Sequence, residues 1–420
     1  MKKSVLRPTY MRRLIDAQNN GLIKIVSGIR RAGKSYLLKT LFRNYLLEQG
    51  VPTSHILVID LEGRQNTTFR NPDYLLEWID EKIQDDEQYY IIIDEVQRVE
   101  DFVEMLGSLV IKENADVYVT GSNSHFLSSD IATEFRGRSD EIHVYPLSFD
   151  EFMTAYEGDK ADGLQEYYMY GGLPKLLSIK GDDKKASYLE RLYRTVYLRD
   201  IYERHTIKNK AEFEELVRVL AAGIGSLMSP TTLANTFKSI KRLQNITDKT
   251  IDTYIGYLQD AFLIEKAERY DIKGRQYIGS SSKYYFKDCG LRNAILSFRQ
   301  FAQNHIMENV LYNNLRERGF LVDIGNVNIR VRDENGVQQR VTLVVDFVCN
   351  LGSKRYYVQS AWRMPDEEKM EQEQRSLCQI NDEFRKLIVV GERIKLHRDE
   401  KGITIASVYD FLLEKTTIDQ

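Results

Sequence analysis

A short apolar run, a glycine-framed loop and a helix pattern follow one another near the start of this chain, and together they constrain its fold more than any other feature. Residues 22–27 (LIKIVS) are typical of a strand, and residues 28–35 read GIRRAGKS. In the next stretch, 36–50, apolar residues recur at helical spacing. Gly28 and Gly33 allow such a loop to curl so that its backbone N–H groups point inward.

The loop matches the pattern G-x-x-x-x-G-K-[ST] without a mismatch. In that pattern Lys34 places an ammonium on the β- and γ-phosphates of a nucleoside triphosphate, and the Ser35 hydroxyl ligates Mg²⁺. The alternative is a plain glycine turn before a helix, but here the loop also follows a strand, as phosphate binding requires. ATP and Mg²⁺ are therefore the predicted cofactors. The predicted nucleotide-binding residues of this segment are Gly28, Ile29, Arg30, Arg31, Ala32, Gly33, Lys34, Ser35 and Tyr36.

Two adjacent carboxylates, Asp94 and Glu95, follow a run that is apolar at every position, as expected of a strand buried on both faces. In P-loop ATPases an Asp at this point holds the Mg²⁺ shell, and the following Glu polarises the attacking water. A solvated strand end is the alternative for an isolated Asp-Glu pair. The position after a buried strand favours the catalytic interpretation. It makes Ser35 and Asp94 the predicted metal ligands, and Lys34 and Glu95 predicted catalytic residues.

Two further polar segments lie downstream. The strand 116–120 ends in a hydroxyl and continues as Gly-Ser-Asn-Ser, so Thr120, Ser122 and Asn123 are candidates for orienting the water or sensing the γ-phosphate. A polar turn is the alternative. Residues 135–138 (FRGR) precede another strand. An arginine there can stabilise transition-state charge in its own site or in that of a neighbouring copy, and a surface salt bridge is the alternative.

Strand and helix patterns alternate over about the first 150 residues, which predicts an α/β fold with a parallel sheet covered by helices. We expect an ATPase core over residues 1–147 and a helical lid over 148–210. Three helix patterns and a hairpin-like pair of strands then predict a winged-helix domain over 211–290. A second α/β unit is expected over 291–420.

Charge and composition narrow the class of protein. Lys and Arg number 59 and Asp and Glu 62, a net charge of −3, so binding to nucleic acid would need a local basic patch. No apolar stretch approaches the roughly 20 residues of a membrane helix, and the start lacks the apolar run of a signal peptide. The three cysteines are too scattered for a zinc site or a disulfide framework. We therefore expect a cytoplasmic protein with no membrane partner.

One segment, 266–299, has a local basic excess of eight basic residues against three acidic ones. Lysines on a wing suit phosphate contacts, so DNA or another nucleic acid is a candidate partner through the winged-helix region. The third helix pattern, 247–260, argues the other way, because Asp248, Asp252 and Asp260 would repel phosphates. Packing between domains is the alternative role for this region.

Several motifs occur in a fixed order along nearly the whole chain: SGIRRAGKS, IIIDEVQ, VTGSNS, FRGR, YPLSFDEF, YGGLP, LRDI, KYYFKDCGLRNA and VDFV. With them the chain resembles a bacterial and archaeal family of uncharacterised AAA+-type ATPases that carry a C-terminal domain of unknown function. The resemblance implies a RecA-like core sheet in which Asp94 holds Mg²⁺ and Glu95 activates water. It also implies Ser122 or Asn123 at the sensor position and Arg138 as the arginine finger.

The resemblance also implies which residues lie near the adenine end of the nucleotide. It suggests that Gly172 and Pro174 form a lid turn that meets this end, which adds Pro174 to the predicted nucleotide-binding residues. It also suggests that the segment around Arg7 and Tyr10 packs near the base.

The C-terminal unit looks like a restriction-endonuclease-type fold, in which two carboxylates around Mg²⁺ and a nearby lysine cleave a phosphodiester. Glu308 and Asp346 can supply the acids. Gln359 and Ala361 stand where Glu and Lys would be needed, and neither can replace the missing chemistry. We therefore expect no nuclease activity from this degenerate unit.

These predictions combine into an Mg²⁺-dependent ATPase of AAA+ type that acts as a nucleotide-driven switch or motor associated with nucleic acid. The alternative is a signalling or defence switch that binds a protein partner in an ATP-dependent way. If Arg138 acts on a neighbouring copy, the protein is a homo-oligomer and its turnover depends on assembly.

Overall fold

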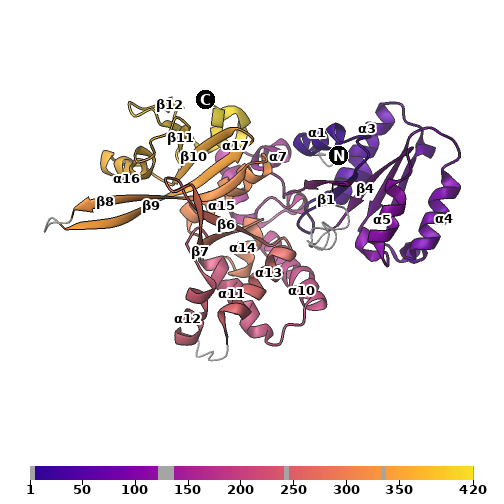
Figure 1. Cartoon of the computed structure of the whole chain (residues 1–420), viewed down its shortest axis with the longest axis horizontal. Helices are drawn as coiled ribbons and strands as arrows, with labels where there is room; N and C mark the ends of the chain where they lie inside the picture. Colours follow the sequence, from indigo (N-terminus) through magenta and orange to yellow (C-terminus); the bar gives the residue numbers. More distant parts are fainter. Residues whose placement is uncertain (1–4, 122–136, 241–245, 333–336, 420) are drawn as a thin grey trace. The chain divides into compact units, whose positions relative to one another are not determined.

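The computed structural model describes residues 5–121, 137–240, 246–332 and 337–419, and the chain divides into two compact units (Figure 1). Unit 1 consists of Met1–Leu147, Leu173–Ser178 and Asp260–Phe262. Unit 2 consists of Ser148–Gly172, Ile179–Gln259 and Leu263–Gln420. None of the described helices is long and apolar enough to cross a membrane.

A five-stranded parallel sheet in the order β2-β3-β4-β1-β5 forms the centre of unit 1. The strands are β1 (Ile23–Ser27), β2 (Ile56–Asp60), β3 (Tyr89–Asp94), β4 (Ala115–Thr120) and β5 (Ser139–His143). The predicted parallel sheet is thereby confirmed. Every residue of β1 and β3 is buried, because both strands have a neighbour on each side and helices on the faces of the sheet.

Helices connect these strands. They are α1 (Pro8–Asp16), α2 (Lys34–Tyr36), η1 (Leu37–Phe42), α3 (Arg43–Glu48), η2 (Thr53–His55), η3 (Arg64–Arg70), α4 (Pro72–Lys82), η4 (Val96–Arg98) and α5 (Phe102–Val110). The segments α2, η1 and α3 form one continuous helix whose middle turn is a π-helix, a variant that is frequent at functional sites.

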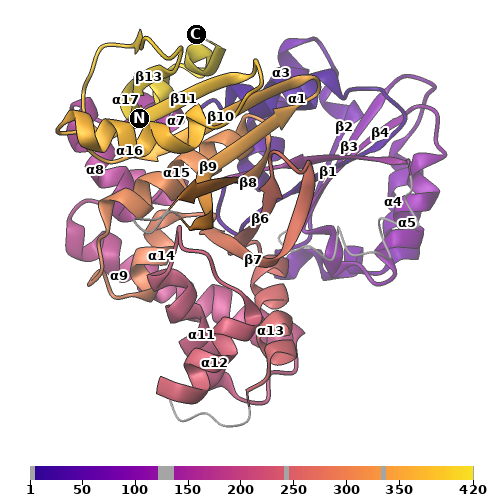
Figure 2. The same ribbon diagram turned by 60° about the vertical axis from the view of Figure 1, so that its left-hand side comes forward.

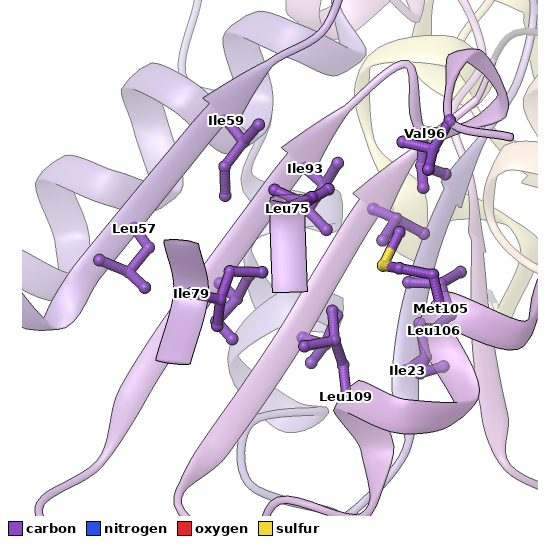
Figure 3. Close-up of a cluster of buried hydrophobic side chains, with 14 of the residues drawn as sticks. Ile23, Leu57, Ile59, Leu75, Ile79, Ile93, Val96, Met105, Leu106 and Leu109 are labelled. Atoms are coloured by element: carbon purple, nitrogen blue, oxygen red, sulfur yellow. The ribbon is translucent and has the colours of Figure 1, made fainter. Parts of the chain in front are cut away.

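One face of this sheet is covered by α4 and α5 (Figure 3). Their apolar side chains interlock with those of the strands, and the labelled members of this cluster include Leu75, Ile79, Met105, Leu106, Leu109, Ile23, Leu57, Ile59 and Ile93. Burying each such side chain contributes roughly 1.5–3 kcal/mol, so this layer fixes the positions of the strand tips.

Unit 2 contains an eight-stranded mixed sheet in the order β12-β13-β11-β10-β9-β8-β6-β7. Its strands are β6 (Ile264–Asp271), β7 (Gln276–Phe286), β8 (Leu321–Arg332), β9 (Gln338–Leu351), β10 (Lys354–Ala361), β11 (Arg385–Val390), β12 (His397–Arg398) and β13 (Thr404–Ser407). The hairpin of β6 and β7, predicted as a wing, pairs through β6 with β8. The predicted boundary at residue 290 therefore falls inside one sheet-bearing unit.

The helices after unit 1's sheet are α7 (Phe149–Ala155), α8 (Lys160–Tyr170), η6 (Pro174–Ser178), α9 (Asp182–Leu192), η7 (Tyr193–Leu198), α10 (Arg199–Arg204), α11 (Lys210–Ala222), α12 (Pro230–Ile240), α13 (Asp248–Asp260), α14 (Cys289–Ile295), α15 (Gln303–Glu317), α16 (Glu367–Cys378), α17 (Val408–Leu413) and η8 (Lys415–Asp419). Two of these helices, α15 and α16, lie beside β9 and β10 (Figure 2).

The side chains of β9 show which face of the sheet each of these helices covers. Phe347 contacts Tyr312 of α15, whereas its neighbour Val348 clusters with Leu377 of α16. Because successive strand residues point to opposite faces, α15 and α16 cover opposite faces of the sheet.

Three helices, α11 to α13, occupy the region predicted as a winged helix. The apolar residues Ile251, Tyr254, Ile255 and Leu258 of α13 are buried, as expected for core positions. A backbone bridge joins Met228, ahead of α12, to Ser282 on β7. The helices and the hairpin are thus present and connected, but the hairpin is also the edge of the eight-stranded sheet.

Candidate nucleotide-binding site

The predicted site residues gather at one edge of the parallel sheet. Strands β1, β3 and β4 end at Ser27, Asp94 and Thr120, and parallel pairing brings these three ends to the same edge. From β1 the chain crosses to β2 on one side of the sheet, whereas from the neighbouring β4 it crosses to β5 on the other side, so the ends of β1 and β4 form a switch point at which ligands of α/β sheets bind. The glycine-framed loop lies at this point.

The backbone of the loop depends on its two glycines. Gly28 has φ 131°, and a Cβ there would lie 2.2 Å from the carbonyl oxygen of Val144. Gly33 has φ 99° and precedes the helix that begins at Lys34. The first N–H groups of a helix have no acceptor within it, so this end carries partial positive charge toward the loop. The arrangement fits the phosphates of a nucleotide.

Lys34 is buried within the loop, with 5% of its surface exposed. Its Nζ donates to the carbonyl oxygens of Gly28 (2.7 Å) and Ile29 (3.1 Å). Burial lowers the pKa of Lys34 to about 8, and the carboxylate of Glu95 opposes this shift. The side chain is therefore mostly an ammonium at neutral pH and loses its charge in mildly alkaline solution.

We expect nucleotide affinity to fall as the pH rises from 7 to 9. The Lys34 ammonium, which attracts phosphate, is present below a pKa of about 8 and is lost above it. If only the charged form binds, the dissociation constant for ATP should rise by about tenfold over this interval. Titration with a fluorescent ATP analogue at each pH measures the effect, and an unchanged affinity would contradict a phosphate-binding Lys34 with a pKa of about 8.

Asp94 is the centre of a hydrogen-bond network at the strand tips. Its Oδ1 accepts from the Ser35 hydroxyl at 2.8 Å and from the Thr120 hydroxyl at 2.6 Å. Thr120 in turn accepts a hydrogen bond from the backbone N–H of Glu95 at 2.9 Å. Ser35 and Asp94 offer the hard oxygen atoms that Mg²⁺ prefers, so the predicted metal ligands are adjacent and of the right chemistry.

Glu95 adopts a strained backbone conformation at the tip of β3. It has φ 60° and ψ 49°, in the left-handed region that non-glycine residues rarely occupy. Its carboxylate accepts a hydrogen bond from the side chain of Gln97. Strain of this kind is concentrated at functional sites, where the surrounding structure holds it in place. Gln97 is the last residue of the IIIDEVQ motif, but no role was predicted for it from the sequence, since only the two carboxylates of that motif indicated a chemistry.

Arg7 supports the outer side of the loop. This buried residue donates to the carbonyl oxygens of Ala32 and Tyr145, each at 2.9 Å. Its guanidinium lies 4.4 Å from the ring centroid of Tyr10, whose hydroxyl accepts from the Tyr145 N–H at 3.0 Å. Tyr10 is fully buried, so its ring supports Arg7 and offers no free face to a base.

The predicted lid turn is divided between the two units. Pro174, in unit 1, lies 3.6 Å from the position that a Cβ on Gly33 would take, so it is adjacent to the loop. Gly172, in unit 2, donates its N–H to Asp288 at 2.8 Å. Tyr36, also predicted to bind nucleotide, is exposed on the first helical turn.

Arg138 lies at the opposite edge of the sheet from the loop. Its carbonyl oxygen accepts from the N–H of Ile23, the first residue of β1, whereas the loop follows the last residue of that strand. At about 3.3 Å per residue, β1 separates the two by roughly 13 Å of backbone. The side chain of Arg138 is exposed, and its backbone lies at the end of β1 away from the loop of its own chain. Ser122 and Asn123 lie outside the described residues.

The basic segment 266–299 is largely neutralised inside unit 2. Lys283, Lys287 and Arg292 are buried, and Lys287 pairs with Glu265. Arg292 donates to the carbonyl oxygens of Ala221 and Gln300 and to the side chain of Asn293, and Lys266 pairs with Glu268. The exposed basic residues that remain are Lys273, Arg275 and Arg299. The patch available to phosphates is thus smaller than the sequence indicates.

The predicted remnant of a nuclease site contains an internal lysine. Lys283, on β7, lies 2.7 Å from Glu308 and 3.0 Å from Asp346. Burial raises the pKa of Glu308 to about 7, although Lys283 opposes this shift. Gln359 contacts Glu373 at 3.3 Å. No group of three or more His, Cys, Asp or Glu residues within the described ranges is arranged to hold a metal ion.

Comparison with protein families gives the class of the nucleotide-binding unit. Residues 20–153 match the AAA domain family, and residues 161–302 match a domain of unknown function. The matched AAA region contains all five strands of the parallel sheet and the glycine-framed loop. The predicted combination of an AAA domain with a domain of unknown function is confirmed, whereas the endonuclease-type C-terminal fold stays a prediction.

Curated relatives cover the chain more fully. An uncharacterised protein of Haemophilus influenzae is 31% identical over 419 residues, which cover 98% of this chain and 100% of that protein. This chain belongs to the family of that Haemophilus protein. An uncharacterised protein of Methanocaldococcus jannaschii is 28% identical over 311 residues, covering 71% of this chain and 67% of the relative.

Solved structures with partial similarity include the Aeropyrum pernix ORC1 protein in complex with DNA. It has 14% identity and a TM-score of 0.31, and the match covers 72% of this chain and 94% of that chain. AMPPCP-bound DnaA of Aquifex aeolicus has 13% identity and a TM-score of 0.29, with coverage of 61% and 88%. TM-scores at this level do not establish a shared overall fold. The assignment of residues 20–153 to the AAA domain family therefore rests on the sequence match.

Proposed function

We propose that this protein is an Mg²⁺-dependent ATPase that uses nucleotide binding or hydrolysis to change the state of its second unit. The observation that carries this proposal is the meeting of Ser35, Lys34 and Asp94 at one sheet edge, with the Ser35 hydroxyl 2.8 Å from the Asp94 carboxylate. Asp and Lys side chains are rarely buried unless they are paired. Here the buried Lys34 and Asp94 flank a loop whose backbone fits phosphates.

Each residue has a distinct role in the proposal. Lys34 and the loop N–H groups bind the phosphates, and Ser35 and Asp94 hold Mg²⁺, which neutralises phosphate charge when it is bound. Glu95 orients and deprotonates the attacking water. Thr120 is a positioning residue, because its hydroxyl joins the Asp94 carboxylate to the Glu95 backbone.

Phosphate release with and without a divalent ion tests the activity. The purified protein should hydrolyse ATP in MgCl₂ and lose this activity in excess EDTA, because the phosphates and Asp94 then repel each other without an ion between them. Activity that persists unchanged in EDTA would exclude the proposed role of the Asp94 site.

The partner of the ATPase is either nucleic acid or protein. The few exposed basic residues of the β6–β7 hairpin and the acidic residues of α13 favour a protein partner over DNA. Turnover and nucleotide affinity are measured with duplex DNA and with RNA to test for a nucleic-acid partner. Pull-down in the presence and absence of ATP tests for a protein partner. Salt-sensitive stimulation by duplex DNA would select the nucleic-acid motor, and its absence at low salt would exclude it.

A further inference from the structure

Lys39 lies between two carboxylates beside the proposed magnesium site. Its Nζ is 2.7 Å from Oδ2 of Asp94 and 2.8 Å from Oδ2 of Asp60. Lys39 follows Ser35 by one helical turn, so both side chains reach Asp94 from the same helix face. Ser35 contacts Oδ1 of Asp94 and Lys39 contacts Oδ2.

The two carboxylates are neighbours because of the strand register. Asp60 ends β2 and Asp94 ends β3, and the two residues are paired in the parallel ladder. Like charges side by side on a sheet repel each other. Asp94 is buried, and the Lys39 ammonium, 2.7 Å from Oδ2, is the charge that faces this oxygen.

Lys39 supplies the positive charge at this position. Its Nζ lies within hydrogen-bond distance of both carboxylates, so the ammonium offsets the repulsion between them. Without it, two carboxylates and the Ser35 hydroxyl would present the oxygen ligands from which divalent-ion sites are built.

We propose that Lys39 is an internal counter-cation that prevents Asp60 and Asp94 from holding a divalent ion until a nucleotide brings one. The triphosphate then supplies further oxygen ligands and negative charge, which offset the repulsion between the Lys39 ammonium and the divalent ion. This inference rests on the proposed function for the role of the ion. Its test needs no ATP hydrolysis, because it measures ion binding in the absence of nucleotide.

The test measures Mn²⁺ binding to the nucleotide-free full chain by electron paramagnetic resonance. Lys39→Met removes the charge and keeps most of the apolar stem, so Mn²⁺ should bind at least about tenfold more tightly than to the parent. Lys39→Arg should behave like the parent because it keeps the charge. Adding Asp60→Asn to Lys39→Met should weaken binding again, which assigns the new affinity to the carboxylate pair.

A matched control separates this effect from the loss of any ion pair. Lys112 pairs with Asp80 at 2.6 Å in the same unit and is 29% exposed, compared with 27% for Lys39. Lys112→Met should leave Mn²⁺ affinity unchanged. If Lys39→Met does not fold, Lys39→Gln is measured instead. Equal Mn²⁺ affinity of the parent and a folded charge-removing variant would overturn the proposal, whether or not the parent hydrolyses ATP.

Discussion

Replacing Glu95 with Gln should leave ATP binding near the parent level and lower the hydrolysis rate by about 10²–10⁴-fold. The amide keeps the size of the side chain but cannot accept a proton from the attacking water. The Glu95 backbone is fixed by Thr120, and its left-handed conformation is imposed by the strand tip, so the variant should fold as the parent does.

Single-turnover phosphate release and a nucleotide-binding titration check this expectation together. Glu113→Gln, an exposed change in the same unit, serves as the control and should alter neither quantity. A Glu95→Gln protein that hydrolyses ATP at the parent rate would show that another group activates the water.

Replacing Arg138 with Ala should lower turnover by about 10³-fold and preserve nucleotide binding. Because β1 separates Arg138 from the loop of its own chain, the arginine would have to act on a neighbouring copy. Turnover of the parent should therefore rise more than linearly with protein concentration until assembly is complete.

Mixing two inactive variants tests this arrangement directly. Arg138→Ala keeps an intact phosphate loop, and Lys34→Ala keeps an intact arginine, so a mixed assembly should recover part of the activity. Arg64→Ala, an exposed arginine in unit 1, is the matched control and should behave like the parent. A mixture that stays inactive, together with turnover proportional to concentration, would show that the arginine does not act on a neighbouring copy, and an Arg138→Ala protein with the parent's turnover would remove it from the mechanism.

Local patterns predicted much of the nucleotide-binding edge. The loop 28–35 is a contiguous segment whose glycines, lysine and serine fix their own geometry, so its spacing in sequence is enough to predict it. Asp94 could be predicted because a strand that is apolar at every position must be interior, and its last residue must then lie at the sheet edge.

Residues brought together by strand register could not be predicted. Lys39 appears as an ordinary lysine in a helix and Asp60 as an ordinary strand end. The pairing of β2 with β3 places Asp60 beside Asp94, and the helix segment η1 brings Lys39 to both carboxylates. Lys283 is counted as a basic residue of a wing in the sequence, but the structure buries it between Glu308 and Asp346. Charge counted along a sequence does not show which charges face inward.

Isothermal titration calorimetry with ATP in the presence of MgCl₂ tests the central claim most directly. The parent protein should release heat with one ATP bound per chain, and Lys34→Ala should lose this signal because the ammonium that attracts the phosphates is gone. A folded parent protein that gives no heat with ATP and Mg²⁺, or a Lys34→Ala protein that binds as tightly as the parent, would contradict the account.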